Sequence, residues 1–295
     1  MELSHLHPKF HHVISLSEQE RINFLHEPRW IGYPDAAKIL DIMNGLINRP
    51  VNSKKDNLLI VGDPNNGKTT IINRFVKIHA KKEIVDGQPS IPVISTEAPP
   101  TADIKGLCIS ILEKFNAPYN MNHPHMKLMH QITHLMELCQ VKILIIDEIH
   151  SLLAGSILKQ REAMNAIKKL CNTLNIPIIA VGTHDALTIL MTDKQHKSRF
   201  DCIALKEWDL DKNYQLLLSD FEKIIPLANA SDLHLVKSAT LLHDITGGNI
   251  GHLHKLLINC ATDAIISGEE KISYKLIQEK EWFKPKEDGV RHISF

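Results

Sequence analysis

The sequence lacks several features that mark secreted and membrane-spanning proteins. Its five cysteines include no C-x-x-C pair, which argues against a disulfide framework or a thiolate zinc site and favours a reducing compartment. Long apolar runs are also missing: ILII at 143–146 is far shorter than the roughly 20 residues that span a bilayer. The first ten residues, MELSHLHPKF, have no apolar segment of the signal-peptide kind. We therefore expect a cytoplasmic protein with no membrane partner.

The chain also has a formal net charge of zero, because 34 basic residues balance 34 acidic ones. No global basic surface is expected, so any contact with nucleic acid must come from a local patch. The 18 histidines raise the question of a metal site, and His130 and His134 would share one face of a helix. However, HQITH lacks the glutamate of the zinc-protease helix H-E-x-x-H, so we expect a solvated helix face there.

What the sequence does contain is a phosphate-binding pattern. In LLIVGDPNNGKTTIINRF (58–75) a strand-like run, a turn and an amphipathic helix follow one another, and GDPNNGKT fits G-x-x-x-x-G-K-[ST]. Its glycines let the backbone N–H groups point inward, and the helix N-terminus completes an electropositive cup for a polyphosphate. The alternative is a glycine turn with an exposed lysine. The predicted nucleotide-binding residues of this loop are Gly62, Asp63, Pro64, Asn65, Asn66, Gly67, Lys68, Thr69 and Thr70.

Two of these residues have more specific predicted roles. Lys68, which we expect to be exposed on the loop, would reach the outer phosphates of ATP, and Thr69 would hold Mg²⁺. A second Mg²⁺ ligand is expected from ILIIDE at 143–148, a buried strand whose last residues deliver Asp147 to the carboxyl edge of the sheet. Glu148, which follows, would orient and polarise the water that attacks the γ-phosphate. The alternative is a strand that ends in solvated acids.

Two further positions are catalytic candidates. Thr183 follows the strand-like run IPIIAVG; if that strand inserts between the two motif strands, Thr183 could hydrogen-bond the γ-phosphate or the attacking water. The alternative is a helix cap ahead of HDALTIL. Arg199, in TDKQHKSRFD, precedes the last strand. It could reach the phosphates of a neighbouring subunit's nucleotide and act there as an arginine finger, which neutralises charge in the transition state. Its alternative is an ordinary surface arginine.

The order of the elements predicts an α/β fold. Strand-like runs at 57–62, 91–96, 141–148, 176–183 and 201–208 alternate with helical patterns, which is typical of a parallel sheet, here of five strands, covered by helices. From about 209 the strands stop and three amphipathic helices follow. The predicted divisions are an N-terminal arm at 1–28, an α/β nucleotide-binding domain at 29–208, a helical lid at 209–280 and a tail at 281–295.

The ordered motifs GDPNNGKT, ILIIDE, VGT and SRF, followed by a helical lid, resemble the AAA+ P-loop ATPases over residues 30–275. More narrowly, RWIGYPDA, IIDEIHSLLAGS and GTHDALTILMTDKQHKSRF look like TniB, the transposition ATPases related to TnsC and the phage Mu B protein. The resemblance implies ATP-dependent self-assembly into a ring or helical filament on duplex DNA. It also implies target choice for a partner transposase with an RNase-H-like domain, and an adaptor of the TniQ type.

The resemblance also suggests nucleotide contacts outside the loop. Ile31, Tyr33 and Pro34 would lie near the adenine, although ordinary packing against the lid would also explain them. In the third lid helix, where relatives often carry an arginine, GGNIGHLHKLL offers His252, which is shorter and mostly neutral at pH 7. Lys255 is a possible substitute.

Relatives contact DNA through basic residues that follow the second strand and the acidic-pair strand. The matching candidates here are Lys105, Lys159 and Arg161. Three charges per subunit are few, but repetition around an assembly would multiply the phosphate contacts.

The sequence thus predicts an ATPase that regulates DNA transposition: ATP drives assembly on duplex DNA, and hydrolysis releases it. One rival is a protein-remodelling machine, although the loop EAPPTADIKG lacks the aromatic residue that threading usually needs. The other rival is a nucleotide switch or scaffold without useful turnover.

Overall fold

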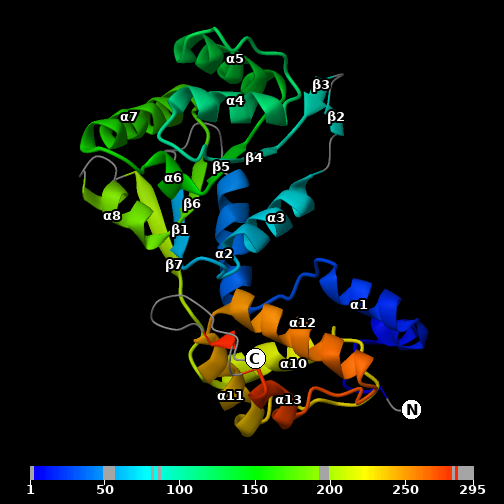
Figure 1. Ribbon diagram of the computed structural model, residues 1–295. Coiled ribbons are helices and arrows are strands. Elements are labelled where there is room, and N and C mark those ends of the chain that lie inside the picture. Colours follow the sequence, from blue (N-terminus) through cyan, green and yellow to red (C-terminus); the bar gives the residue numbers. More distant parts are fainter. Residues whose placement is uncertain are drawn as a thin grey trace. The chain divides into compact units, whose positions relative to one another are not determined.

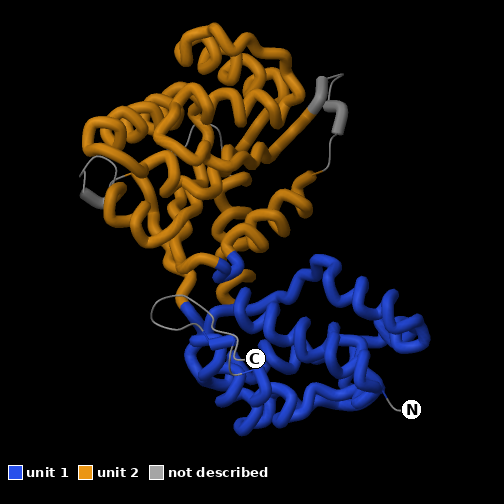
Figure 2. The backbone as a smooth tube through the Cα atoms, viewed as in Figure 1, with its two compact units in different colours: residues 1–33, 65–67, 207–295 blue, residues 34–64, 68–206 orange. Residues whose placement is uncertain are grey.

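The chain forms two compact units, shown in different colours in Figure 2. The computed structural model describes residues 3–48, 57–80, 83–85, 88–192, 199–280 and 283–284. The α/β unit comprises 34–64 and 68–206, and the helical unit comprises 1–33, 65–67 and 207–295. This division differs from the predicted one, because the N-terminal segment groups with the C-terminal helices.

The α/β unit contains a five-stranded sheet in the order β4-β5-β6-β1-β7, and every neighbouring pair is parallel (Figure 1). The strand β6 lies between β5 and β1, which meets the condition on which the suggested role of Thr183 depends. The strands are β1 Asn57–Gly62, β4 Val93–Glu97, β5 Ile143–Asp147, β6 Ile178–Gly182 and β7 Phe200–Leu205. A separate antiparallel pair, β2 Glu83–Val85 and β3 Gln88–Ser90, has no counterpart in the sequence-based prediction.

Helices connect and cover these strands. Every residue of β1, β5 and β6 is buried, because a parallel sheet has helices on both faces and its central strands are therefore apolar throughout. The helices of this unit are α2 Pro34–Ile47, α3 Lys68–His79, α4 Ile104–Lys114, α5 His125–Leu138, α6 Ile149–Leu152, α7 Ile157–Leu174 and α8 His184–Thr192.

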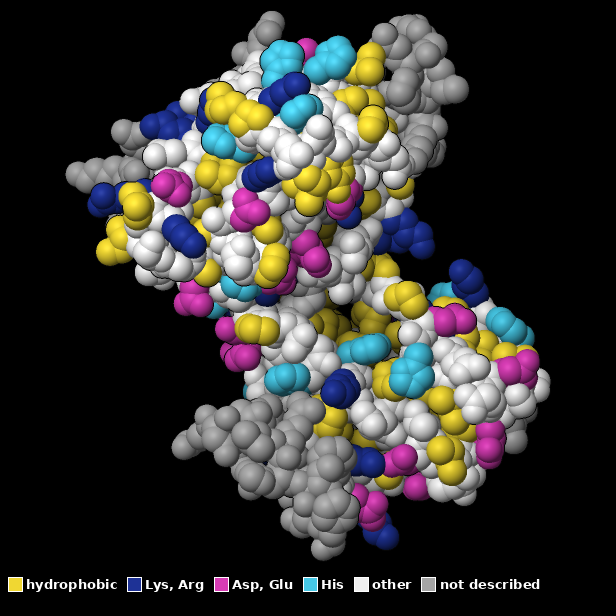
Figure 3. Space-filling model, turned by 45° about the horizontal axis from the view of Figure 1, so that its top comes forward, with side chains coloured by type: hydrophobic (Ala, Val, Ile, Leu, Met, Phe, Trp, Pro, Cys, Tyr) yellow, Lys and Arg dark blue, Asp and Glu magenta, His cyan; other side chains and the backbone are white. Residues whose placement is uncertain are grey.

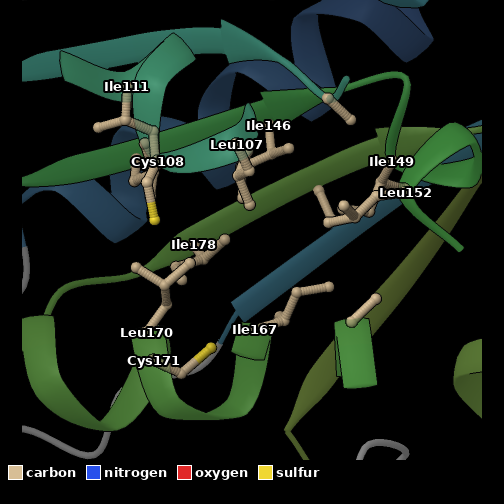
Figure 4. Packing of buried hydrophobic residues seen from close by; sticks show 14 of the residues in the cluster. Leu107, Cys108, Ile111, Ile146, Ile149, Leu152, Ile167, Leu170, Cys171 and Ile178 are labelled. Atoms are coloured by element: carbon tan, nitrogen blue, oxygen red, sulfur yellow. The ribbon is translucent and has the colours of Figure 1, made fainter. Parts of the chain in front are cut away.

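A hydrophobic cluster fixes the end of β5 and the short helix α6 (Figure 4). Ile146 of β5 and Ile149 of α6 pack in the same cluster as Leu107 of α4, Ile167 of α7 and Ile178 of β6. All five side chains are at most 1% exposed. The residues between Ile146 and Ile149 are therefore held from both sides by close-packed apolar groups.

The helical unit is built from both ends of the chain. Its elements are the 3-10 helix η1 Pro8–Ser15, then α1 Glu18–His26, α10 Lys212–Glu222, α11 Val236–Thr246, α12 Ile250–Ile266 and α13 Tyr274–Gln278. Ser17 and Glu20 form a capping box at the start of α1. Arg21 of α1 donates two hydrogen bonds to Glu270 and a third to the carbonyl of Pro226. These bonds anchor the N-terminal segment within the unit.

Across the described segments, each helix is too short or too polar to cross a bilayer.

Candidate nucleotide site

The predicted phosphate loop connects β1 to α3 and has the backbone that its glycines require. Asn65 and Gly67 both have positive φ values, of 60° and 82°. At Gly62 a Cβ atom would lie 2.6 Å from the carbonyl oxygen of Leu205, so a larger residue would push β7 away. The loop is therefore specified by Gly62 and Gly67 for two different reasons, close backbone approach and left-handed conformation.

Lys68 is buried, with 7% of its surface exposed, so the expectation of an exposed loop lysine is wrong. Its Nζ donates to the carbonyl oxygens of Gly62 and Asp63, at 2.8 and 2.7 Å. Burial lowers the pKa of Lys68, and the negative charges of nearby carboxylates, Glu148 first, oppose that shift. The ammonium group is thus held inside the loop by two neutral carbonyl acceptors.

The two predicted Mg²⁺ ligands meet at the carboxyl edge of the sheet. Thr69 Oγ1 donates to Oδ2 of Asp147 at 2.8 Å, although 78 residues separate them in the sequence. Asp147 is 4% exposed. Hydroxyl and carboxylate oxygens are the hard ligands that Mg²⁺ prefers, so this donor set fits that ion.

Glu148 and Thr183 lie at the same edge. The backbone of Glu148 is left-handed, and its N–H donates to Oδ1 of Asp147 at 2.8 Å. Thr183 directly follows β6, between the strands that carry the loop and the acidic pair. Its Oγ1 is shielded from solvent and has no hydrogen-bond partner among the described residues. The hydroxyl therefore does not cap α8, as one interpretation of the sequence proposed.

Arg199 lies at the amino ends of the strands, opposite the carboxyl ends that carry the phosphate loop and the acidic pair. Its carbonyl accepts hydrogen bonds from the backbone N–H and from Nδ2 of Asn57, the first residue of β1, both at 3.1 Å. Its Nη1 donates to Oδ1 of Asn172 at 2.7 Å. Since β1 rises about 3.3 Å per residue, Gly62 at its other end is about 17 Å away. The neighbouring Lys194 and Lys197 lie outside the described residues.

The predicted adenine contacts differ in burial. Tyr33 is buried and meets Trp208 edge to face, with ring centroids 5.2 Å apart. Within the helical unit, a Cβ at Gly67 would lie 3.4 Å from the Tyr33 hydroxyl. By contrast, Ile31 is half-buried, and Pro34 is exposed as the first residue of α2.

The lid candidates lie on α12. The backbone N–H groups of Gly251 and His252 are capped by Oδ1 of Asn249, and the Gly251 N–H also donates to the Asn65 carbonyl at 3.0 Å. The first turn of α12 thus contacts residue 65 of the phosphate loop. Lys255 extends toward Phe283, with Nζ 6.0 Å from the ring centroid.

The predicted DNA contacts lie on two helices. Lys105 is half-buried in the first turn of α4, whereas Lys159 and Arg161 are exposed near the start of α7. Ile157 and Leu158, next to them, are 69% and 68% exposed. On the face shown in Figure 3, basic and acidic side chains of the described residues are interspersed, as the zero net charge leads one to expect.

One residue of the site was not found from the sequence. His150, two positions after Glu148, has its Nδ1 3.3 Å from Oε2 of Glu148. The available signal was its place in DEIH, where a short helix after the strand would fold the histidine back toward the glutamate.

Comparison with known proteins identifies both the fold and the family. A family model described as "Bacterial TniB protein" matches residues 21–210. A search of curated protein sequences gave no significant match. Among solved structures, Cdc6p from Pyrobaculum aerophilum has a TM-score of 0.66 at 16% identity, over 92% of this chain and 72% of that one.

Two further structures are similar. The Aeropyrum pernix ORC2 protein, in its ADPNP-ADP complexes, has a TM-score of 0.63 at 15% identity, over 87% of this chain and 69% of that one. Drosophila ORC bound to DNA has a TM-score of 0.60 at 11% identity, over 90% of this chain and 65% of that chain. The likenesses confirm the predicted AAA+ P-loop fold.

Proposed function

Since the chain belongs to the TniB family, we propose that it is a Mg²⁺-dependent ATPase that assembles on duplex DNA and directs a partner transposase to its target. The observation that carries the proposal is the hydrogen bond that joins the phosphate loop helix to the end of the acidic-pair strand. There Thr69 and Asp147 are hydrogen-bonded at 2.8 Å beside a lysine buried in a phosphate-type loop. The AAA+ fold and the nucleotide complexes of the Aeropyrum ORC2 protein also support ATP as the ligand.

Different residues at the phosphate loop would bind different parts of Mg²⁺-ATP. Backbone N–H groups and Lys68 would hold the phosphates, and Thr69 with Asp147 would hold Mg²⁺. The ion would supply neutralisation of the charge that develops on the phosphate oxygens. Thr183, with a shielded hydroxyl and no described partner, would donate a hydrogen bond to the γ-phosphate or to the attacking water.

Glu148 would orient the attacking water and accept its proton. The residue stands one position beyond Asp147, and its side chain is 44% exposed. Its carboxylate is therefore accessible to water at the same edge of the sheet as the phosphate loop.

Arg199 would serve the neighbouring subunit's nucleotide. In its own subunit it lies at the amino end of β1, about 17 Å along the strand from the phosphate loop. A guanidinium group at that edge can neutralise transition-state charge only across an interface between two copies. Hydrolysis would then depend on assembly.

DNA would bind through phosphate contacts repeated along the assembly. Lys105, Lys159 and Arg161 are the candidate residues, and the DNA complex of the Drosophila ORC neighbour supports this use of the fold. The transposase and a TniQ-type adaptor are the partners that the TniB family membership suggests.

The proposed function can be tested with a variant that is expected to accumulate in the ATP-bound state. Glu148→Gln keeps the Mg²⁺ and phosphate contacts but removes the base, so the variant should bind ATP and remain on duplex DNA as long-lived oligomers. Binding should show little sequence preference and weaken steeply as salt rises, since the contacts are to phosphates. The measurement is DNA binding by the trapped variant across a salt series, with ADP as the nucleotide control.

A charge reversal supplies the protein control. Arg161→Glu should weaken DNA binding without lowering ATP affinity, whereas the same change at an acidic neighbour, Glu162→Lys, should not weaken it. Equal DNA binding with ATP, with ADP and without nucleotide would reject the proposed function in DNA transposition. It would favour a protein-remodelling machine or a nucleotide switch.

A further inference from the structure

The backbone around Glu148 is unusually constrained. Its φ and ψ of 55° and 33° are left-handed, a conformation that a side chain with a Cβ adopts only where its surroundings hold it. Two hydrogen bonds do so: the Glu148 N–H donates to Oδ1 of Asp147 at 2.8 Å, and the Glu148 carbonyl accepts from the Ser151 N–H at 2.9 Å. The start of the glutamate side chain is therefore fixed, but these bonds do not fix its carboxylate.

His150 is the residue that contacts this carboxylate. Its Nδ1 lies 3.3 Å from Oε2 of Glu148, is shielded from solvent and makes no hydrogen bond, to Glu148 or to any other described residue. The distance is that of an ion pair rather than a well-aligned hydrogen bond. Contacts of this length between catalytic side chains commonly shorten when substrate binds.

The position of His150 is itself set by close packing. A Cβ at Gly182, the last residue of β6, would lie 2.9 Å from Cγ2 of Ile149 and 3.4 Å from the backbone nitrogen of His150. Ile149 is fully buried. The short helix α6 therefore rests directly on β6, and the histidine ring extends from a rigid base.

We propose that His150 is a positioning residue that holds the Glu148 carboxylate, through its Nδ1–H, where that carboxylate can orient the attacking water. The inference rests on the proposed ATPase function.

Two matched variants test which nitrogen matters. The amide nitrogen of asparagine lies two bonds beyond Cβ, as Nδ1 of histidine does, whereas that of glutamine lies three bonds beyond, as Nε2 does. His150→Asn should therefore keep most of the wild-type kcat. His150→Gln and His150→Ala should lower kcat about 10- to 100-fold, with KM for ATP changed less than about 2-fold, since misplacement of a catalytic group acts on the chemical step.

Coupling to Glu148 gives the second kinetic test. If His150 acts only through Glu148, adding His150→Ala to Glu148→Gln should lower kcat no further than Glu148→Gln alone. Urea unfolding of each variant checks that the fold is intact. A multiplicative effect in the double variant would contradict the proposal.

A spectroscopic measurement needs no turnover. In long-range ¹H–¹⁵N spectra of the full chain, the ring nitrogens of His150 are assigned by their loss in His150→Asn. Their shifts should change in Glu148→Gln and stay unchanged in Asp185→Asn, a substitution of an acid on α8 as the control. Unchanged His150 signals in Glu148→Gln would overturn the inference.

The outcomes separate this inference from the proposed function. A wild-type protein that binds ATP but does not hydrolyse it, with DNA present, would reject the proposed ATPase and the role of His150 with it. A hydrolysing wild type with an unchanged kcat in His150→Ala, or equal losses in the asparagine and glutamine variants, would overturn the role of His150 alone.

Discussion

At the scale of single residues, Lys68 would combine two roles that the sequence motif does not distinguish. Its ammonium group donates to the carbonyls of Gly62 and Asp63 inside the loop, and in the proposed function it would also offer its charge to the phosphates. Lys68→Ala should therefore abolish measurable ATP binding and also lower the free energy of unfolding by about 1 to 2 kcal/mol, because two carbonyl acceptors lose their donor. Nucleotide titration and urea unfolding measure the two effects.

Lys77, exposed on the last turn of the same helix, is the matched control. Lys77→Ala should change neither ATP affinity nor stability by more than about 0.5 kcal/mol, as is usual for surface substitutions. An unchanged nucleotide titration in Lys68→Ala would reject the loop as the ATP site.

At the scale of elements, the ion pair between Arg21 and Glu270 is one of the contacts that hold α1 in the helical unit. Arg21 is 6% exposed, and its Nη1 bonds Oε1 of Glu270 at 2.7 Å. The hydrogen bonds from Arg21 hold the pKa of Glu270 below its ordinary value of 4.5. A carboxyl with a lowered folded-state pKa contributes stability at pH values above 4.5 and loses that contribution as pH falls through the folded-state pKa.

Glu270→Gln should therefore destabilise the protein at pH 7, and the difference from wild type should shrink as pH falls below 4.5, because the wild-type carboxyl becomes neutral as well. Urea unfolding of both proteins between pH 7 and 3 measures this. Glu279→Gln, which removes the exposed partner of Lys275 at 3.8 Å, should cost less than about 0.5 kcal/mol throughout. A Glu270→Gln difference that is constant with pH would contradict the assignment.

For helices and strands, the sequence predicted some elements and contacts and missed others. The β1 to α3 segment and the end of β5 could be predicted because each motif lies within one continuous stretch whose apolar pattern and turn residues carry the signal. The pairing of Arg21 with Glu270 could not, because 249 residues separate them and neither has a distinctive neighbourhood. The strands β2 and β3 have three residues each, too few to show a period.

Local motifs likewise left the contacts of individual site residues undetermined. The pattern G-x-x-x-x-G-K-[ST] predicts a lysine near phosphate but not its burial against the carbonyls of its own loop. In the same way, DEIH identifies a histidine close to Glu148, but only the left-handed backbone at Glu148 and the packing of α6 on β6 bring the two side chains to 3.3 Å.

At the scale of the whole molecule, the separation of Arg199 from its own phosphate loop predicts complementation between subunits. Arg199→Ala should bind ATP normally and hydrolyse it slowly, and Lys68→Ala should not bind it. Mixing the two should restore part of the activity, because an interface can join an intact loop to an intact arginine. ATP hydrolysis across a series of mixing ratios, with assembly checked by light scattering, measures this.

Asn172→Ala is a useful companion, since it removes only the side chain that bonds the Arg199 guanidinium at 2.7 Å. Its activity should fall less than that of Arg199→Ala. Absence of rescue at every ratio, in mixtures that do assemble, would exclude an arginine supplied in trans.

If Arg199 acts in trans as proposed, its place at the amino ends of the strands, with the phosphate loop at their carboxyl ends, would give each subunit a donor side and an acceptor side. Contacts between copies would then be head to tail, and they would either close into a ring or leave two unlike ends. In an open filament one terminal nucleotide would lack a neighbour's arginine and would be hydrolysed slowly. Short filaments would therefore turn over less ATP per subunit than long ones, and one end would keep its nucleotide longest, so the assembly would grow and shrink with a direction along DNA.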